Sequence, residues 1–169
     1  YGMPVIVTRA SNNYGPFQFP EKLIPLMITN AMEDKPLPIY GDGMQVRDWL
    51  YVDDHCRAIW AALSTGEPGE IYNVGGSRAL PNREVVQLIL NALGKPRTLM
   101  TAVKDRPGHD RRYAITTEKL ERATGWRAEV DFETGLARTI EWYGKHHQWV
   151  AHVKSGAYQD YYRTNYSNR

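Results

Sequence analysis

Three polar loops contain the side chains whose chemistry suits nucleotide binding. They are residues 11–16 (Ser-Asn-Asn-Tyr-Gly-Pro), residues 45–49 (Gln-Val-Arg-Asp-Trp) and residues 105–113 (Asp-Arg-Pro-Gly-His-Asp-Arg-Arg-Tyr). Guanidinium groups and backbone amides bind phosphates, and amides or carboxylates bind the hydroxyl groups of a sugar. Taken singly, each loop also has a structural explanation, because asparagines form turns and charged loops form solvated ion pairs. Taken together, they are a candidate nucleotide site.

The hydrophobic pattern places these loops between strands and helices. Short runs of β-branched and aromatic residues predict strands or extended segments at residues 4–9, 37–40, 46–52, 71–74 and 98–103. Apolar residues at helical spacing predict helices at residues 21–32, 53–64, 82–93, 117–124 and 132–147, with Asp53 and Asn82 as N-caps. Residues 10–16 are predicted to form a loop at a strand end. This alternation favours an α/β fold and leaves open whether the strands pair in parallel or in a mixed arrangement.

Composition and charge restrict the class of protein. The 169 residues are 42% hydrophobic and 24% charged, which excludes disorder, collagen and coiled coil as global descriptions. A net charge of +2 is too small for a nonspecific nucleic-acid binder, and no apolar run is long enough to span a membrane. The one cysteine, Cys56, has no partner for an internal disulfide, which fits a reducing compartment. We therefore expect a cytoplasmic protein without nucleic-acid or membrane partners.

The histidines and paired carboxylates have structural explanations. His146, His147 and His152 have no cysteine partner and no HExxH spacing, so a solvated helix end is favoured over a metal site. Asp53 and Asp54 are adjacent at a predicted helix start, where they point in different directions and suit the helix dipole. We expect no metal in this chain.

The order and spacing of the polar loops resemble a known family. Residues 9–16, 47–54 and 72–76 resemble the extended short-chain dehydrogenase/reductase family, which includes the sugar-nucleotide epimerases and dehydratases. Residues 21–25, 41–49 and 105–113 are similar to the dTDP-glucose 4,6-dehydratase branch, and the last of these is the most discriminating. The resemblance spans most of the chain. It implies the C-terminal substrate-binding portion of an α/β enzyme, with the last strand or strands of its Rossmann sheet.

Two features of that family have no counterpart in this sequence. Members carry a glycine fingerprint for NAD and a Tyr-x-x-x-Lys pair, both in an N-terminal Rossmann half. Here Val46 stands where the fingerprint requires glycine, and none of the eleven tyrosines has a lysine four positions later. The chain also begins at Tyr1. We therefore expect residues 1–169 to be one α/β fragment without the NAD-binding half and without catalytic residues, inactive by itself.

The resemblance implies a role for each matching residue. It places Asn12 at the substrate, Asn13 at NAD, and Arg47 at the pyrophosphate, where a guanidinium fork is well suited. The other implied substrate-binding residues are Lys22, Leu23, Pro38, Ile39, Tyr40, Asn82, Asp105, Arg106, Pro107, Gly108, His109 and Tyr166. Without the resemblance, Lys22 is interpreted as a solvated lysine, Tyr40 as a packing residue and Asn82 as a helix cap.

The implied substrate is dTDP-glucose, with NAD as the cofactor of the whole enzyme and deoxysugar (rhamnose) precursor synthesis as the process. Two alternatives stay open: another sugar-nucleotide dehydratase, decarboxylase or epimerase of the family, or a catalytically silent nucleotide-sugar-binding module. The resemblance also implies a homodimer formed through the missing half. Residues 4–9 lack polar alternation, as in a strand covered on both faces, and Ile59, Trp60 and Leu63 share a helix face. Without their neighbours, we expect these residues to promote self-association.

Overall fold

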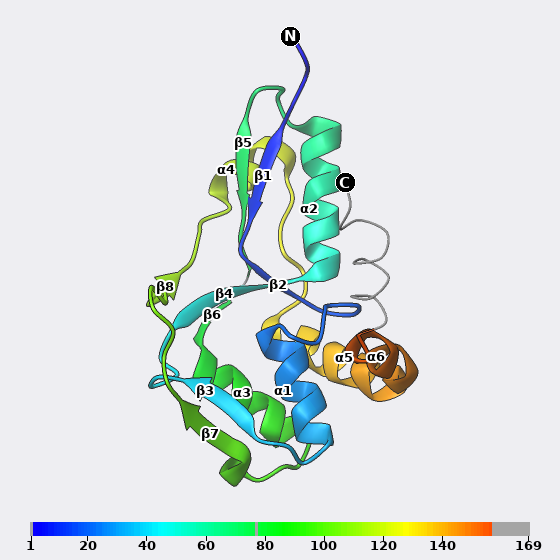
Figure 1. The fold of residues 1–169 in the computed structure, drawn as a ribbon. Helices are drawn as coiled ribbons and strands as arrows, with labels where there is room; N and C mark the ends of the chain where they lie inside the picture. Colours follow the sequence, from blue (N-terminus) through cyan, green and yellow to red (C-terminus); the bar gives the residue numbers. More distant parts are fainter. Residues whose placement is uncertain (1, 77, 157–169) are drawn as a thin grey trace, which may run out of the picture.

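A computed structural model describes residues 2–76 and 78–156, which fold into alternating strands and helices (Figure 1). The first elements are β1 (Val7–Ala10), β2 (Asn12–Tyr14), α1 (Leu23–Met32), β3 (Leu37–Tyr40), β4 (Val46–Tyr51), α2 (Val52–Thr65) and β5 (Ile71–Val74). They are followed by β6 (Arg78–Pro81), α3 (Asn82–Ala92), a 3₁₀ turn (Arg97–Leu99), β7 (Met100–Val103), β8 (Arg112–Tyr113), α4 (Glu118–Thr124), α5 (Phe132–Lys145) and α6 (His147–Lys154). The predicted α/β fold is confirmed.

Strand β4 crosses the middle of the molecule and joins its two regions (Figure 1). It pairs in parallel with β2 and β8 and antiparallel with β6, which makes this sheet mixed. On one side of it, β1 and β5 form a parallel pair that contacts α2, while α4 packs against β5 and α2. We call these four elements the β1/β5 region. Its small core consists of Leu50, Ala58, Ala62, Tyr72, Val74, Leu120 and Trp126.

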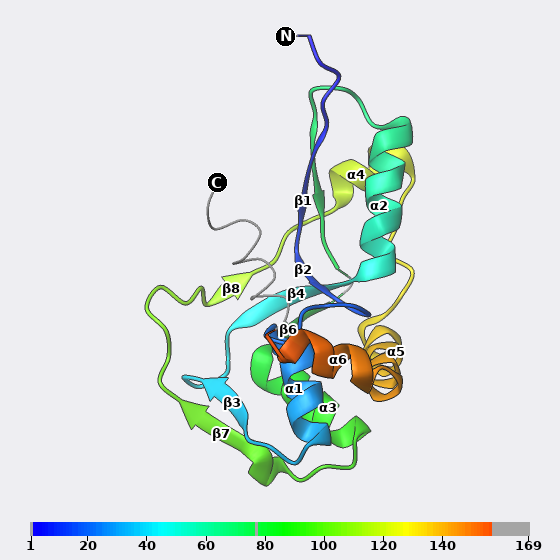
Figure 2. The ribbon, with the colours of Figure 1, turned by 45° about the vertical axis from the view of Figure 1, so that its right-hand side comes forward.

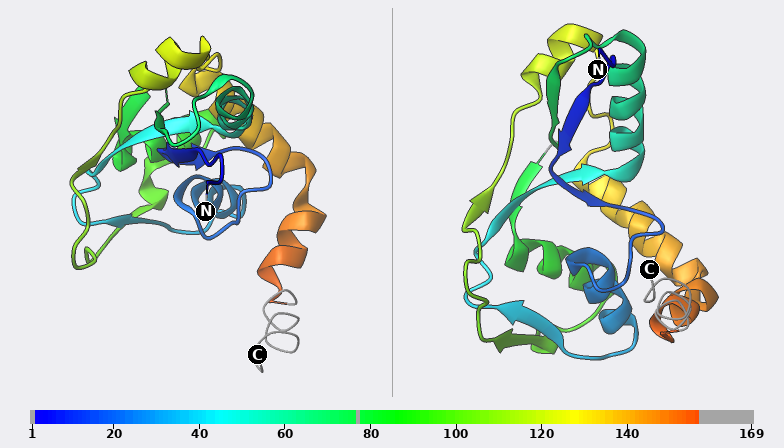
Figure 3. Two further views of the ribbon diagram at one scale, coloured as in Figure 1. Left: turned by 90° about the horizontal axis from the view of Figure 1, so that it is seen from above. Right: turned by 45° about the horizontal axis from the view of Figure 1, so that its top comes forward.

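The second region contains most of the hydrophobic core. Helices α1, α3 and α5 pack against one another, and α1 and α3 also pack against β3 of the parallel pair β3/β7. We call these elements the α1/α3 region; Figure 2 shows β3 and β7 beside α1 and α3. Seen from above in Figure 3, α5 and α6 run along the opposite side of the molecule from β8. The helices form because apolar residues such as Ile24, Ile28, Val85 and Ile89 recur every three or four positions and are buried together.

Several predicted boundaries are wrong. Residues 12–14 form β2 rather than a loop, because their backbone pairs with Trp49–Tyr51 of β4. Strands β6 and β8 were not predicted. The predicted helix 132–147 is α5, which ends two residues earlier at Lys145, and helix α6 (His147–Lys154) was not predicted. These features depend on partners distant in sequence, which a local pattern does not reveal.

Both predicted N-caps are also wrong. Helix α2 has Tyr51 as its N-cap, so Asp53 and Asp54 lie within its first turn. Helix α3 has Pro81 as its N-cap, and the side chain of Asn82 makes no capping hydrogen bond. Asp54 instead accepts hydrogen bonds from the backbone N–H groups of Glu129 and Val130 at 3.2 and 3.0 Å. The carboxylate of Asp54, next to the predicted cap, thus joins α2 to the segment before α5.

The β1/β5 region leaves apolar side chains exposed. None of residues 4–9 is buried, so this segment has no cover among the described residues, as we expected for a strand without its neighbours. Along α2, Cys56, Ile59, Trp60 and Leu63 form an exposed stripe, which we call the α2 stripe. The buried face of this helix carries only Ala58, Ala62 and Asp54. The region is therefore ordered although much of its apolar surface has no cover.

Candidate functional site

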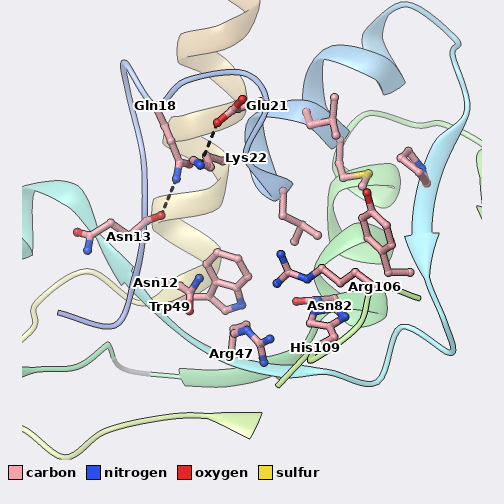
Figure 4. A pocket seen from close by; sticks show the side chains of 15 residues that line it. Asn12, Asn13, Gln18, Glu21, Lys22, Arg47, Trp49, Asn82, Arg106 and His109 are labelled. Atoms are coloured by element: carbon pink, nitrogen blue, oxygen red, sulfur yellow. Dashed lines mark hydrogen bonds and ion pairs between the residues drawn. The ribbon is translucent and has the colours of Figure 1, made fainter. Parts of the chain in front are cut away.

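A cavity of about 370 Å³ lies among α1, β2, β3, β4 and the start of α3 (Figure 4). Its lining residues are Asn12, Asn13, Gln18, Glu21, Lys22, Leu23, Leu26, Met27, Pro38, Tyr40, Arg47, Trp49, Asn82, Arg106 and His109. Figure 4 shows Asn12 and Trp49 on one side, Asn82, Arg106 and His109 on the other, and Arg47 near the base. All three polar loops reach this cavity.

Most of the residues that we predicted for a ligand site line this one cavity. They are Asn12, Asn13, Lys22, Leu23, Pro38, Tyr40, Arg47, Asn82, Arg106 and His109. Four others do not line it: Ile39 is buried in the main core, and Asp105, Pro107 and Gly108 lie in the loop that carries His109. Tyr166 and the other tail tyrosines lie outside the described residues, so the role of Tyr166 stays a prediction.

Strand β4 turns Arg47 toward the cavity. Side chains alternate along a strand, so Arg47 and Trp49 face one side while Asp48 faces the other, where it accepts a 2.8 Å hydrogen bond from the Gly76 N–H. Arg47 as a residue is 8% exposed, and its guanidinium donates to the Val46 carbonyl at 2.8 Å. Within the described part of the chain, no carboxylate lies within ion-pair distance of Arg47. A largely buried arginine that lines a cavity without a counter-ion favours an anionic ligand.

Further basic groups line the same cavity. Lys22 precedes α1, where its ammonium group pairs with Glu21 at 3.0 Å, and Arg106 and His109 enter from the loop after β7. The cavity is also lined by the apolar side chains of Leu23, Leu26, Met27 and Pro38. The cavity therefore combines a basic end, suited to phosphates, with an apolar wall, suited to a planar base.

Several buried polar atoms of the cavity have no partner among the described residues. They are Asn13 Oδ1, Gln18 Oε1, Trp49 Nε1 and Asn82 Oδ1. The other end of the Asn13 amide donates to the Ser11 carbonyl at 3.1 Å, and Gln18 Nε2 donates to the Asn13 carbonyl at 2.8 Å. Buried polar atoms are normally hydrogen-bonded, so these groups are available to a ligand or to water.

The loop that carries His109 is attached to the turn between β3 and β4. Asp105 accepts hydrogen bonds from Gln45 and His109, and Arg111 donates to both carboxylate oxygens of Asp42 at 2.8 and 2.9 Å. The hydrogen bond from His109 holds the pKa of the Asp105 carboxyl below its usual range. Gly41 has a φ of 58°, and a Cβ at this position would lie 2.8 Å from Asp105 Oδ2. Glycine is therefore needed where the turn approaches the loop.

Five lining residues were not predicted: Gln18, Glu21, Leu26, Met27 and Trp49. Trp49 stands two positions after Arg47, so strand alternation alone would have placed both on one face. Leu26 and Met27 lie on the apolar face of α1 and were indistinguishable from core residues. No local sequence pattern identified Gln18 as a lining residue, because its position in the cavity depends on how the loop between β2 and α1 folds.

Neither a metal centre nor a membrane span is found in the described residues. No group of three or more His, Cys, Asp or Glu side chains there is arranged to hold a metal ion. No helix there is long and apolar enough to cross a bilayer.

Comparison with known proteins gives consistent results. A model of the GDP-mannose 4,6 dehydratase family matches residues 1–139. The dTDP-glucose 4,6-dehydratase 1 of Escherichia coli (strain K12) is 53% identical over 176 residues, covering 100% of this chain and 49% of the relative. The crystal structure of the Bacillus anthracis dTDP-glucose 4,6-dehydratase in complex with NAD is 54% identical, with a TM-score of 0.87, and the match covers 90% of this chain and 49% of that one.

A second solved structure is similarly close. The Streptomyces venezuelae dTDP-glucose 4,6-dehydratase, with NAD and dTDP bound, is 48% identical with a TM-score of 0.88. That match covers 90% of this chain and 48% of that protein. The chain thus spans about half the length of the relatives it matches.

Proposed function

This chain belongs to the GDP-mannose 4,6 dehydratase family, and we propose that it forms the C-terminal, nucleotide-sugar-binding half of a dTDP-glucose 4,6-dehydratase. The proposal is supported by 53% identity over the whole chain to an enzyme of that name. In this reaction the sugar is oxidised at C4, loses water across C5 and C6, and is reduced at C6. NAD accepts the hydride from C4 and returns it to C6.

The observation that carries the proposal is the buried Arg47 without a counter-ion, in a cavity that also contains Lys22, Arg106 and His109. We assign Arg47 and Arg106 to the diphosphate, because a guanidinium can donate two parallel hydrogen bonds to phosphate oxygens. Lys22 adds a mobile positive charge at the rim. The neutral sugar then meets the amides of Asn12 and Asn82, and the base lies on the apolar wall.

The residues of this chain do not form an NAD site. Asn13 offers an unpartnered amide oxygen, and we propose that it contacts the cofactor. The sequence contains neither the glycine fingerprint nor a Tyr-x-x-x-Lys pair. We therefore assign no catalytic step to these residues and propose that NAD is bound mostly by the half of the relatives that this chain does not match. By itself, the chain should bind NAD weakly and turn over no substrate.

Two experiments test the function. The chain is joined to the N-terminal half of the Escherichia coli relative, and formation of the 4-keto-6-deoxy sugar is assayed with dTDP-glucose, UDP-glucose and GDP-mannose. We expect turnover of dTDP-glucose. Turnover of a UDP- or GDP-sugar instead would favour another enzyme of the family.

The second experiment avoids any dependence on a chimaera. The chain itself is titrated calorimetrically with dTDP, UDP, GDP and NAD. We expect dTDP to bind more tightly than the other three. Tight binding of NAD would contradict the division of roles, and tight dTDP binding combined with an inactive but folded chimaera would favour a silent binding module.

A further inference from the structure

Asp105 lies behind His109 rather than in the cavity wall. Its Oδ1 accepts hydrogen bonds from His109 Nδ1 at 2.7 Å and from the Arg106 N–H at 2.9 Å, and its Oδ2 accepts one from Gln45 Nε2 at 2.9 Å. The His109 side chain is 6% exposed, whereas that of Asp105 is 40% exposed. The histidine is therefore enclosed in the site, and the aspartate supports it from outside.

The three donors determine which ring nitrogen of His109 carries a proton. An ionised carboxylate has no proton to give, and that of Asp105 already accepts from the Arg106 N–H and from Gln45 Nε2. Nδ1 of His109 is therefore the donor in their contact. The second nitrogen, Nε2, is then the ring atom that remains for a ligand in the cavity. Carboxylates commonly set the tautomer and orientation of functional histidines in this way.

The support for His109 extends to the rest of the fold. Gln45 is buried immediately before β4 and lies sixty positions from Asp105 in the sequence, so their hydrogen bond ties the loop to the central sheet. Tyr40, at the end of β3, approaches the His109 ring edge-on with a centroid distance of 6.3 Å. The ring is thus held by a hydrogen bond at Nδ1 and by an aromatic contact.

From this geometry we propose that Asp105 is a positioning residue: it holds His109 with Nδ1 protonated and presents Nε2 to the ligand. This extends the proposed function, because it assumes that the ligand in the cavity is a nucleoside diphosphate or its sugar derivative. The resemblance assigned Asp105 and His109 the same substrate-binding role, whereas this proposal gives them different roles. Asp105 acts through His109, whereas His109 contacts the ligand.

Alanine is an informative replacement for Asp105 because it removes the carboxylate that accepts from His109 Nδ1. Without that acceptor, the neutral ring should return to the Nε2–H form, which is the favoured tautomer of histidine in water. Asp105→Ala should therefore reverse the tautomer of His109. The matched control is Asp42→Ala, which removes the neighbouring ion pair with Arg111 and leaves Asp105 intact.

The first test needs no ligand. Ring-nitrogen NMR of the ¹⁵N-labelled chain at pH 8 identifies the protonated nitrogen of each of the five histidines, and His109→Gln assigns the signal. We expect Nδ1–H for His109 in the original chain and in Asp42→Ala, and Nε2–H in Asp105→Ala. An Nε2–H form of His109 in the original chain, or an unchanged tautomer in a folded Asp105→Ala variant, would overturn the proposal.

The second test measures dTDP affinity in a double-mutant cycle. Asp105→Ala and His109→Gln should each weaken binding about tenfold, and the double variant no more than about twofold further, because both remove the same contact. Losses that multiply to about a hundredfold would mean that Asp105 acts independently of His109, contrary to the proposal. If the original chain does not bind dTDP, the proposed function fails, and the NMR result still decides the role of Asp105.

Discussion

The α1/α3 region and the β1/β5 region are each built around a pair of four-residue parallel strands, but they differ in how their helices are covered. Each pair has two buried side chains on one strand: Leu37 and Ile39 of β3, and Tyr72 and Val74 of β5. The helices differ more. Helices α1, α3 and α5 pack against one another around a large core, whereas α2 packs only on one face and exposes Trp60 and Leu63, each 69% exposed.

The two regions also differ in what they leave without a partner. The α1/α3 region buries its apolar side chains and leaves polar atoms of Asn13, Trp49 and Asn82 unpartnered in a cavity. The β1/β5 region leaves apolar side chains of the α2 stripe in contact with water. The first arrangement suits a polar ligand, and the second suits a protein surface. Burial and hydrogen bonding thus distinguish the two parts more clearly than their secondary structure does.

The largest expected effect is a difference in the free energy of unfolding between a leucine-to-alanine substitution in one region and the same substitution in the other. Leu90→Ala removes a fully buried side chain of α3, so the free energy of unfolding should fall by about 2–5 kcal/mol. Leu63→Ala, at a position of α2 that is 69% exposed, should change it by no more than about 0.5 kcal/mol. Urea unfolding followed by circular dichroism at low protein concentration measures both. Equal losses would mean that the α2 stripe is covered in solution.

The next effect tests the basic end of the cavity. Arg47→Lys keeps the charge but loses the guanidinium fork, so binding of dTDP-glucose should weaken by about 1–3 kcal/mol. Arg106→Ala should cause a similar loss. Arg111→Lys is the control, because Arg111 pairs with Asp42 and does not line the cavity. If both test variants are folded by circular dichroism and bind dTDP-glucose with unchanged calorimetric affinity, neither arginine binds the diphosphate.

A smaller effect concerns the exposed apolar residues. We expect the chain to self-associate as its concentration rises, and the double substitution Trp60→Glu with Leu63→Glu to reduce this by placing charges on the α2 stripe. Met44→Glu is a matched control, since Met44 is an exposed apolar residue near the other region. Size-exclusion chromatography with light scattering gives the mass at each concentration. A monomer throughout, without binding of a hydrophobic dye, would contradict the expectation.

The smallest effect is the pH dependence of the α5 N-terminus in the α1/α3 region. Asp131 caps this helix by accepting a 2.8 Å hydrogen bond from the Thr134 N–H, and that bond lowers the pKa of the carboxyl. A carboxyl whose pKa is lower in the folded than in the unfolded state stabilises the fold above the unfolded value. This stabilisation is lost as the pH falls through the folded value. The α5 cap should therefore contribute at neutral pH and fade in acid.

Two substitutions measure this contribution. Asp131→Ala should lower the Tm at pH 7, and its difference from the original chain should shrink below about pH 4, near the unfolded pKa of aspartate. Asp131→Asn keeps a good cap that does not titrate, so its Tm should show less acid dependence than that of the original chain. A constant difference between Asp131→Ala and the original chain across this range would exclude the charge as the cause.

Most helices could be predicted because their signal is local. In α3, Val85, Val86, Ile89 and Leu90 recur at helical spacing and are all fully buried. The three residues of β2 gave the opposite signal, since consecutive asparagines favour turns. Their strand conformation comes from pairing with β4, whose residues lie 37 positions later in the register Asn12↔Trp49. Local propensity does not contain that information.

The sequence by itself determined the periodic elements and the identity of the polar loops, because both depend on residue type and short-range spacing. It also determined, through motif order, the family to which the chain belongs. Only the tertiary structure decided that Arg47 has no carboxylate partner among the described residues, that Asp105 supports His109 from outside the cavity, and that the α2 stripe is exposed. These properties arise from contacts between residues far apart in the chain, where the burial of a group and the choice of its partner are set by packing.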